Sequence, residues 1–405
     1  MARWGPWKWR GGEPDRPRAV EDLSRLGSGW ESGAVFALTA LLVSVGLVTM
    51  YSSSAVMAQG QGLVPHHYLL RQMSGALLGM VALLMAAQMD YRRLRPLAWP
   101  LVGVVVVMLF IMLLPAASSI APEAKGARRW LLLGPVTVQP SEVAKLAVIV
   151  WTAALVVKKQ DRLRSLSRGL APLLVVWGLV AGLILLQPDL STALLLVGLA
   201  GLVAFAGGAR PAHFVVLVLA ALPFLWGQVA KAGYRMERLL TFLDPRADLA
   251  DMGYQINQSL IALGSGGLVG QGLGRGQQKF GFLPEPHNDF ILAMIGEEWG
   301  FLGVAALLVL FTTFALVGYR IARGAADLFG FLLAVGVTNL VVVQAFLHIG
   351  VNLALVPATG VTLPFISYGR SSLVVCLAAA GILMSVGRVS DQRGRALARV
   401  RGAGP

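Results

Sequence analysis

Ionisable side chains inside long apolar stretches are the residues of this sequence best suited to do chemistry. Glu142 and Lys145 lie three positions apart in one such stretch, and Glu297 lies in another. Residues at this spacing share one face of a helix and can form an ion pair. Because a charge inside a membrane is costly, each is a candidate functional residue. A buried ion pair that fixes helix packing explains Glu142 and Lys145 equally well.

Two aspartates stand where apolar stretches begin. Asp189 follows Gln187-Pro188 and is well placed to cap the helix that comes next. Asp289 precedes another apolar run. By residue type alone a helix cap is the simpler interpretation of Asp289. The alternative is a general base at the mouth of a membrane helix.

The polar segment 231–288 contains further candidates. Arg235 and Arg238 are one helical turn apart, and residues 253–263 are predicted to form a helix. The glycine-rich run 264–276 follows. Such a run can present backbone N–H groups to a phosphate, or it can be a flexible loop. A dinucleotide-binding fingerprint would need a flanking strand and helix, which this sequence does not predict.

Composition limits which elements can position these residues. The chain has 405 residues, of which 13% are charged and 56% are hydrophobic, and its mean hydropathy is +0.71. Soluble domains carry about 25% charged residues, so a soluble globular protein and a disordered chain are both excluded. Cys376 is the single cysteine, which excludes an intrachain disulfide and a cysteine-based metal site. A net charge of +14 is typical of nucleic-acid binding, unless the basic residues lie in cytoplasmic loops between membrane spans.

The gaps between charged residues locate those spans. A helix needs about 20 apolar residues to cross the hydrocarbon core. Pro357 and Pro364 break the long uncharged stretch between Asp327 and Arg370 into a span, an irregular or re-entrant segment and a last span. We therefore expect an all-α polytopic membrane protein with about ten transmembrane helices, near 35–58, 68–89, 97–115, 140–157, 170–187, 190–207, 213–230, 289–318, 328–349 and 369–387.

The distribution of lysine and arginine sets the orientation. Most of these residues fall in the tails and in alternate loops when both termini are placed in the cytoplasm. The segment 231–288 is then one long outer loop between helices 7 and 8. The predicted organisation is a cytoplasmic tail over 1–33, a transmembrane domain over 34–388 and a cytoplasmic tail over 389–405. The first tail contains Trp4, Trp7 and Trp9 and is expected either to be frayed or to bind a surface or a partner. It is too long for a signal-peptide n-region.

A set of short motifs recurs in order across these spans, and through them the chain resembles the SEDS family (shape, elongation, division and sporulation), which includes FtsW and RodA. Gln258–Ala262, Gln278-Lys279 and the long first tail are more like the division branch, FtsW, than the elongation branch, RodA. Arg370 departs from the family pattern, because it stands where a second glycine is usual. The motifs are Arg129-Trp130, Pro140-Ser141-Glu142 with Lys145, Gln187-Pro188-Asp189-Leu190, Arg238-Leu239 with Phe242-Leu243-Asp244-Pro245, Gly253-Tyr254-Gln255, Leu283-Pro284-Glu285 with His287 and Asp289-Phe290-Ile291, Gly296-Glu297-Glu298, and Leu363-Pro364-Phe365-Ile366-Ser367-Tyr368-Gly369.

The resemblance implies a peptidoglycan glycosyltransferase that polymerises lipid II at the outer face of the bacterial plasma membrane, during septal cell-wall synthesis. It implies that Asp289 is catalytic, and a base there would take the proton of the attacking sugar hydroxyl. It leaves a divalent cation, Mg²⁺ or Mn²⁺, as an optional cofactor and names no metal ligands. Residues expected to bind the substrate are Arg129, Trp130, Glu142, Lys145, Arg235, Arg238, Lys279, Glu285, His287, Glu297, Ser367 and Ser371.

The expected partners are lipid II, the polyprenyl-pyrophosphate-linked glycan, a class B penicillin-binding protein and other division proteins of the membrane, with no nucleic acid. Three alternatives remain. The chain could serve elongation, as RodA does, could flip lipid-linked precursor across the membrane, or could act as a scaffold for the penicillin-binding protein. Charges within the membrane and broken helices suit a transporter, whereas the charges here cluster at the outer face.

Overall fold

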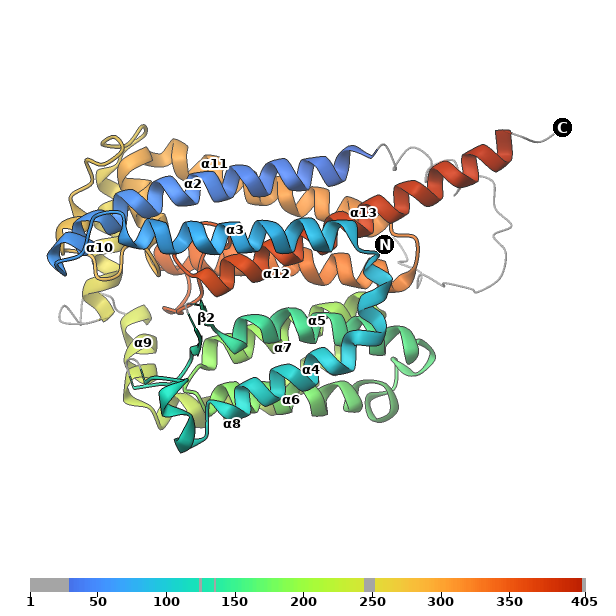
Figure 1. Cartoon of the computed structure of the whole chain (residues 1–405). Coiled ribbons are helices and arrows are strands. Elements are labelled where there is room, and N and C mark those ends of the chain that lie inside the picture. The colour runs from blue at the N-terminus through green and yellow to red at the C-terminus, as the bar shows by residue number, and fades with distance from the viewer. Residues whose placement is uncertain (1–28, 124–125, 135, 244–251, 403–405) are drawn as a thin grey trace, which may run out of the picture.

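The computed structural model describes residues 29–123, 126–134, 136–243 and 252–402, and it is a bundle of long, roughly parallel and antiparallel helices (Figure 1). Residues 1–28 lie outside this range, so the structure does not describe most of the predicted first tail. The bundle helices are α2 (Trp30–Gly60), α3 (His67–Gln88), α4 (Leu94–Ile111), α5 (Pro140–Lys158), α6 (Ala171–Leu185), α7 (Leu190–Ala206), α8 (Pro211–Ala230), α11 (Ile291–Arg323), α12 (Leu328–Asn352) and α13 (Arg370–Gly402).

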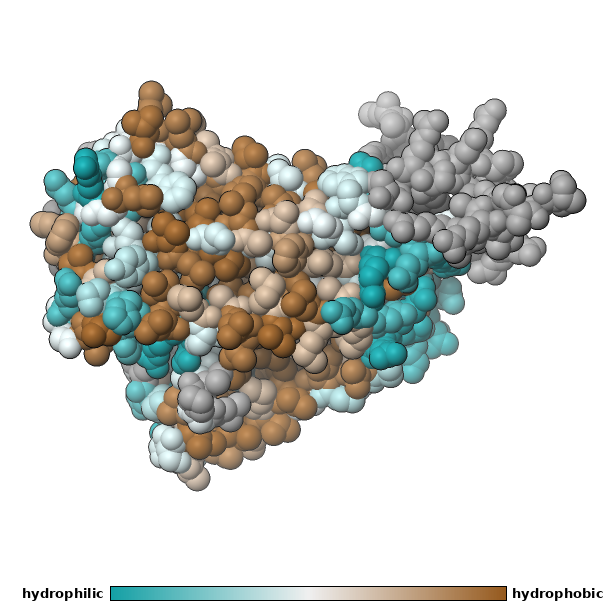
Figure 2. Space-filling view, turned by 45° about the horizontal axis from the view of Figure 1, so that its top comes forward, coloured by the Kyte–Doolittle hydropathy of each residue, from teal (hydrophilic) through white to brown (hydrophobic). Residues whose placement is uncertain are grey.

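These helices confirm the predicted all-α membrane architecture. Within the described ranges, nine helices are long and apolar enough to cross a membrane. The tenth, α7, is equally apolar but has 17 residues, the lower limit for a span. Asp189 caps α7 as predicted, because its carboxylate accepts hydrogen bonds from the amide and the hydroxyl of Thr192. Figure 2 shows the apolar belt between two more hydrophilic ends.

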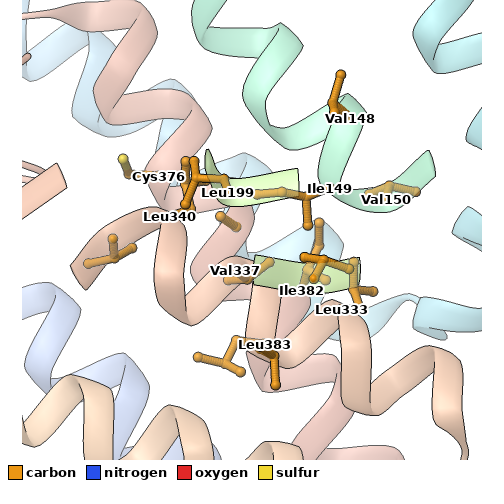
Figure 3. Packing of buried hydrophobic residues seen from close by; sticks show 14 of the residues in the cluster. Val148, Ile149, Val150, Leu199, Leu333, Val337, Leu340, Cys376, Ile382 and Leu383 are labelled. Carbon is orange, nitrogen blue, oxygen red and sulfur yellow. The ribbon is translucent and has the colours of Figure 1, made fainter. Parts of the chain in front are cut away.

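Helices α12 and α13 occupy the centre of the bundle. In each of these two helices, 78% of the residues in the apolar 18-residue stretch are buried. No residue in the corresponding stretch of α8 is buried, so α8 lies at the lipid-facing edge of the bundle. Figure 3 shows the packing of α12 through Leu333, Val337 and Leu340 against residues of α5 and α13. A Cβ atom at Gly336 would collide with the side chains of Ile149 and Val203. Helices in lipid associate through such close packing of small residues.

The glycines of α3 allow equally close packing of this helix against the outer end of α13. A Cβ atom at Gly75 would lie 3.1 Å from Cγ of Arg370, and one at Gly79 would collide with the side chain of Leu377. Gly75 and Gly79 are four residues apart, a spacing that lets two helices approach closely. The start of α13, which carries Arg370, is therefore held tightly against α3.

Helix α11 breaks at Gly300, which adopts φ 68° and ψ −165°. A break inside the membrane exposes backbone groups that must find partners within the protein. The glycine-rich run supplies them, so at this contact it packs against α11. The amides of Gln271 and Gly272 donate to the carbonyls of Glu297 and Glu298 at 3.0 Å each, and the amides of Phe301 and Leu302 donate to the carbonyls of Gly267 and Leu268 at 2.8 and 3.1 Å.

The outer end carries several shorter elements. The long loop forms α9 (Gly233–Leu243), α10 (Met252–Ser265) and a 3₁₀ turn, η5 (Gln278–Phe280), which confirms the predicted helix at 253–263. A short antiparallel hairpin, β1 (Leu131–Leu133) and β2 (Val136–Val138), was not predicted. Helices α9 and α10 lie at the end of the bundle opposite to the start of α2 and the end of α13 (Figure 1).

Irregular backbone follows α12, as the two prolines predicted. Phe365, Ile366 and Ser367 are buried, and a Cβ atom at Gly46 of α2 would lie 2.6 Å from the carbonyl oxygen of Phe365. The segment is thus enclosed by protein, which is the condition for irregular structure at membrane depth. The last helix continues past the predicted end of the span, because α13 runs to Gly402.

Candidate functional site

A cavity of about 1230 Å³ opens at the outer end of the bundle. One part of its wall consists of polar residues of β2, α9 and the segments before α11 and α13. Another part is apolar and includes Leu194, Leu199 and Leu202 of α7 and Val343 and Leu347 of α12. Of the predicted site residues, the cavity wall includes Asp289, Arg129, Trp130, Arg235, Arg238, Glu285, His287 and Ser371.

Asp289 lies at this wall, half-buried, two residues before the first residue of α11. The N-cap position falls on Phe290, and no side chain caps the helix there. Asp289 therefore lies one residue before the N-cap position. Its carboxylate belongs to the wall of the cavity, where a general base would need to be.

Three hydrogen bonds hold the backbone around Asp289. The side-chain amide of Asn352 donates to the carbonyl of Asp289 at 3.2 Å, and the hydroxyl of Ser367 donates to the carbonyl of Asn288 at 2.9 Å. The amide of Tyr368 donates to the carbonyl of His287 at 3.0 Å. The end of α12 and the irregular segment before α13 together fix the position of Asp289.

The rings of Tyr68, His287 and Tyr368 contact one another beside this backbone. Their centroids are 5.0 Å apart for Tyr68 and His287, and 5.4 Å apart for each of the other two pairs. All three residues line the cavity. Sequence reasoning selected His287 and missed both tyrosines, because a tyrosine near the end of a membrane span is common.

Arginines supply the positive charge of the cavity wall. Arg129 donates to the carbonyls of Gln187 and Pro188 at 3.2 and 2.9 Å, which directs it to the turn before α7. Arg235 and Arg238 lie one turn apart on α9, as predicted, and Arg235 also bonds Gln228. Arg370 lines the same cavity and donates to the hydroxyl of Thr137 at 2.8 Å, so the charge expected near the cavity is present.

The two predicted serines occupy different places. Ser371 lines the cavity, where its hydroxyl accepts from the amide of Gln139 and donates to the carbonyl of Thr137, both at 3.0 Å. Ser371 thus ties β2 to the start of α13. Ser367 is buried and bonds the amide of Leu363 as well as the carbonyl of Asn288. The position of Ser367 suits support of the Asp289 backbone rather than contact with a substrate.

Glu142 and Lys145 form the ion pair that their spacing predicted, with 2.9 Å between the carboxylate and the ammonium group. Both are buried, and neither lines the cavity. The ammonium group of Lys145 also donates to the side chain of Gln344 on α12 at 2.6 Å. The pair therefore joins α5 to α12 beneath the cavity, and Gln344 is a partner that sequence reasoning missed.

Lys279 and Glu297 likewise lie away from the cavity wall. The ammonium group of Lys279 is 2.9 Å from the carboxylate of Glu298, which also accepts a hydrogen bond from Ser52 of α2 at 2.7 Å. The carboxylate of Glu297 accepts from the amide of Gln277 at 2.7 Å. These contacts attach η5 to α11 and α2. The structure does not bring Lys279 or Glu297 to a position for direct contact with a substrate in the cavity.

The described residues do not form a cage for a metal ion. No three His, Cys, Asp or Glu side chains within the described ranges gather closely enough to hold one. A divalent ion carried by a pyrophosphate needs only one or two protein carboxylates, and Glu285 and Asp289 are carboxylates at the cavity wall. Asp244 and Pro245 lie outside the described residues.

Comparison with known proteins agrees with this architecture. The family model FTSW_RODA_SPOVE, described as a cell cycle protein, matches residues 33–392. A relative from Geobacter metallireducens, named probable peptidoglycan glycosyltransferase FtsW, is 42% identical over 87% of this chain and 93% of its own. Stage V sporulation protein E of Bacillus subtilis is 40% identical over 87% of this chain and 96% of its own.

Two solved structures share the fold. One, a chain from a study titled "Structural coordination of polymerization and crosslinking by a peptidoglycan synthase complex", superposes with a TM-score of 0.72 at 31% identity, and the match covers 88% of this chain and 97% of that chain. The other, Thermus thermophilus rod shape determining protein RodA, gives a TM-score of 0.63 at 29% identity over 89% of this chain and 96% of that chain. The resemblance seen in the motifs is confirmed, and the chain belongs to the FtsW, RodA and SpoVE family of multi-pass membrane proteins.

Proposed function

We propose that this chain is a peptidoglycan glycosyltransferase that polymerises lipid II at the outer face of the membrane during cell division. The observation that carries the proposal is the cavity, in which Asp289 shares the polar wall with four arginines, Arg129, Arg235, Arg238 and Arg370. The names of the relatives support the class of reaction, since several of them are called peptidoglycan glycosyltransferase FtsW.

The two parts of the cavity match the two parts of a lipid-linked sugar. The polar part suits the sugar and the pyrophosphate, and the apolar part along α7 and α12 suits the polyprenyl chain. Leu194 and Leu202 of α7 are 47% and 38% exposed, so this part opens toward the lipid. A substrate could therefore enter from the membrane without leaving its apolar surroundings.

In the proposed reaction, the 4-hydroxyl oxygen of one lipid-linked sugar attacks the anomeric carbon of another. The new glycosidic bond forms as the bond between that carbon and the pyrophosphate oxygen breaks. The hydroxyl proton passes to the carboxylate of Asp289, and a positioned base of this kind contributes about 10²–10⁴-fold in rate. The pyrophosphate leaves with the bonding electrons and gains negative charge.

The arginines would stabilise that charge. Guanidinium groups bind phosphate oxygens through two parallel hydrogen bonds, and preorganised donors at the place where charge develops lower the barrier. Trp130, Glu285 and His287 line the same wall and would contact the sugars. Ser367, Glu142 and Lys145 would act through the position of the backbone and helices around them.

A similar structure from a peptidoglycan synthase complex supports a class B penicillin-binding protein as the partner that crosslinks the new strands. The description of the matching family as a cell cycle protein supports the division septum as the place of action. The penicillin-binding protein as partner, the septum as place of action and lipid II as substrate are all parts of this proposal.

Polymerisation by the purified chain tests the proposal. We expect the chain, in detergent with labelled lipid II, to form glycan strands that gel electrophoresis resolves as a ladder, and we expect the penicillin-binding protein to raise the yield. A detergent solution has no second compartment, so a flippase would leave lipid II unchanged. A scaffold would also form no strands, and either result would overturn the proposal.

A further inference from the structure

A second cavity, of about 550 Å³, lies at the opposite end of the bundle from Asp289. It is formed by the last residues of α3, by the 3₁₀ turn η1 (Tyr91–Arg93) and by α13 past its apolar part. Its lining carries four arginines, Arg92, Arg93, Arg388 and Arg393, and one carboxylate, Asp90. Arg92 also forms an ion pair with Asp327, which lies outside the lining, at 2.8 Å. The proposed glycosyltransferase reaction uses none of these residues.

Hydrogen bonds to the backbone hold two of these arginines in place. The guanidinium group of Arg388 donates to the carbonyl of Gln88 at 2.6 Å, and that of Arg393 donates to the carbonyl of Ala326 at 2.7 Å. The guanidinium groups are therefore built into the end of the bundle, unlike arginines on a mobile surface.

One donor in this cavity has no acceptor. The Nε atom of Arg388 is buried, and within the described residues it has no hydrogen-bond partner. Buried donors are nearly always paired in folded proteins, so this donor is available to an acceptor of a ligand or to a water molecule. Asp90, the carboxylate of the lining, accepts a hydrogen bond from the amide of Arg92 at 2.9 Å.

The cavity also borders the lipid-facing surface. Met85 in the last turn of α3 is 69% exposed, and Leu97 in the first turn of α4 is 46% exposed. Figure 2 shows hydrophilic residues at the ends of the molecule directly beside the apolar belt. A ligand with a charged head in the cavity could therefore lay apolar chains along α3 and α4.

We propose that this cavity binds the phosphate group of an anionic phospholipid of the cytoplasmic leaflet. Basic pockets between transmembrane helices at this face suit such head groups, and arginine forms paired hydrogen bonds with phosphate. The head group of an anionic phospholipid such as phosphatidylglycerol carries no positive charge. The head group of phosphatidylcholine carries a quaternary ammonium group, which the arginines would repel, so the cavity should prefer the anionic lipid. Free phosphate shares the chemistry but lacks the apolar chains.

Lipid binding to the purified full-length chain in detergent tests the proposal. Native mass spectrometry would measure the affinity for phosphatidylglycerol, phosphatidylcholine and inorganic phosphate. Each arginine near a membrane surface contributes a factor of about five in affinity for anionic lipid. We expect Arg388→Gln with Arg393→Gln to weaken phosphatidylglycerol binding on the order of 20-fold. The matched control, Arg164→Gln with Arg168→Gln, removes two exposed arginines from another cytoplasmic loop and should leave the affinity unchanged.

Arg93→Gln keeps the test valid if the double variant folds poorly. The side chain of Arg93 is exposed, so its replacement should spare the packing and still weaken phosphatidylglycerol binding about fivefold. Unchanged affinity in Arg93→Gln and in the double variant would overturn the site. Equal affinity for phosphatidylcholine or for inorganic phosphate would overturn its assignment to an anionic lipid. Lipid II polymerisation in detergent should persist in all these variants, so failure here is distinguishable from failure of the proposed reaction.

Discussion

The side chain of Asn352 connects the last residue of α12 to the backbone of Asp289. Its amide nitrogen donates to the carbonyl of Asp289 at 3.2 Å, and its oxygen accepts from the amide of Ala293, in the first turn of α11, at 3.1 Å. Asn352 is completely buried and lies outside the cavity wall. It is thus a positioning residue for the proposed base, and it contacts no substrate.

Replacement of Asn352 by alanine should therefore lower kcat and leave KM nearly unchanged. Misplacement of a reacting group by about 1 Å can cost about 10²-fold in rate. The measurement is the steady-state rate of lipid II polymerisation at several substrate concentrations. Asn339→Ala is the control, because Asn339 is a buried asparagine on the same helix that bonds Val335 and Tyr319 instead. Equal losses in the two variants would show that Asn352 acts only through stability.

The ion pair of Glu142 and Lys145 should be needed for stability more than for chemistry. Lys145→Met leaves a buried carboxylate without its cation, which costs about 3–5 kcal/mol. The double variant Glu142→Gln with Lys145→Met removes both charges and should recover most of that loss. Thermal unfolding in detergent measures the stability, and polymerisation measures the activity. A stable double variant without activity would instead assign chemistry to the pair.

Arg238 should contribute to stabilisation of the leaving pyrophosphate. Arg238→Gln removes one of four arginines of the cavity wall, and loss of one such preorganised donor typically lowers kcat by about 10²–10³-fold. Lys231→Gln is the control, since Lys231 is exposed and lies outside the cavity wall. The ratio of the two kcat values is the measurement, and a ratio near one would remove Arg238 from the reaction.

The contact between the glycine run and the break in α11 should tolerate no side chain at Gly270. This residue has φ 81°, and a Cβ atom there would collide with the backbone of Glu298 and Trp299. Gly274 has φ 79°, with open space around it. Both alanine variants strain the backbone by about 1 kcal/mol, but Gly270→Ala also separates the loop from α11. We expect a clearly lower thermal unfolding midpoint for Gly270→Ala than for Gly274→Ala. Similar midpoints would contradict the structure of this contact.

The membrane architecture could be predicted from the sequence because charge is so costly in lipid. The gaps between charged residues placed all ten bundle helices, including α7, and two prolines marked the irregular segment before Ser367. The break at Gly300 could not be predicted in this way. It depends on hydrogen-bond partners between Gly267 and Gly272, which lie 26 to 34 residues before the backbone groups that they satisfy.

The site was predicted in part. The sequence singled out Asp289 and the arginines of the cavity wall. Residue type did not distinguish them from Lys279 and Glu297, which lie elsewhere. Lys279 forms an ion pair with Glu298, and the carboxylate of Glu297 accepts a hydrogen bond from the amide of Gln277. Gln344, Asn352 and Tyr368 were missed. A buried asparagine or glutamine in an apolar span was the available signal for the first two, since such a group needs a specific partner.

The central claim is that the carboxylate of Asp289 takes the proton of the attacking hydroxyl. The most direct test is the polymerisation rate of purified Asp289→Asn and Asp289→Ala, with membrane insertion and thermal unfolding checked against the unchanged chain. We expect both variants to fold and neither to extend a glycan strand. Strand formation by folded Asp289→Ala at the rate of the unchanged chain would contradict this claim.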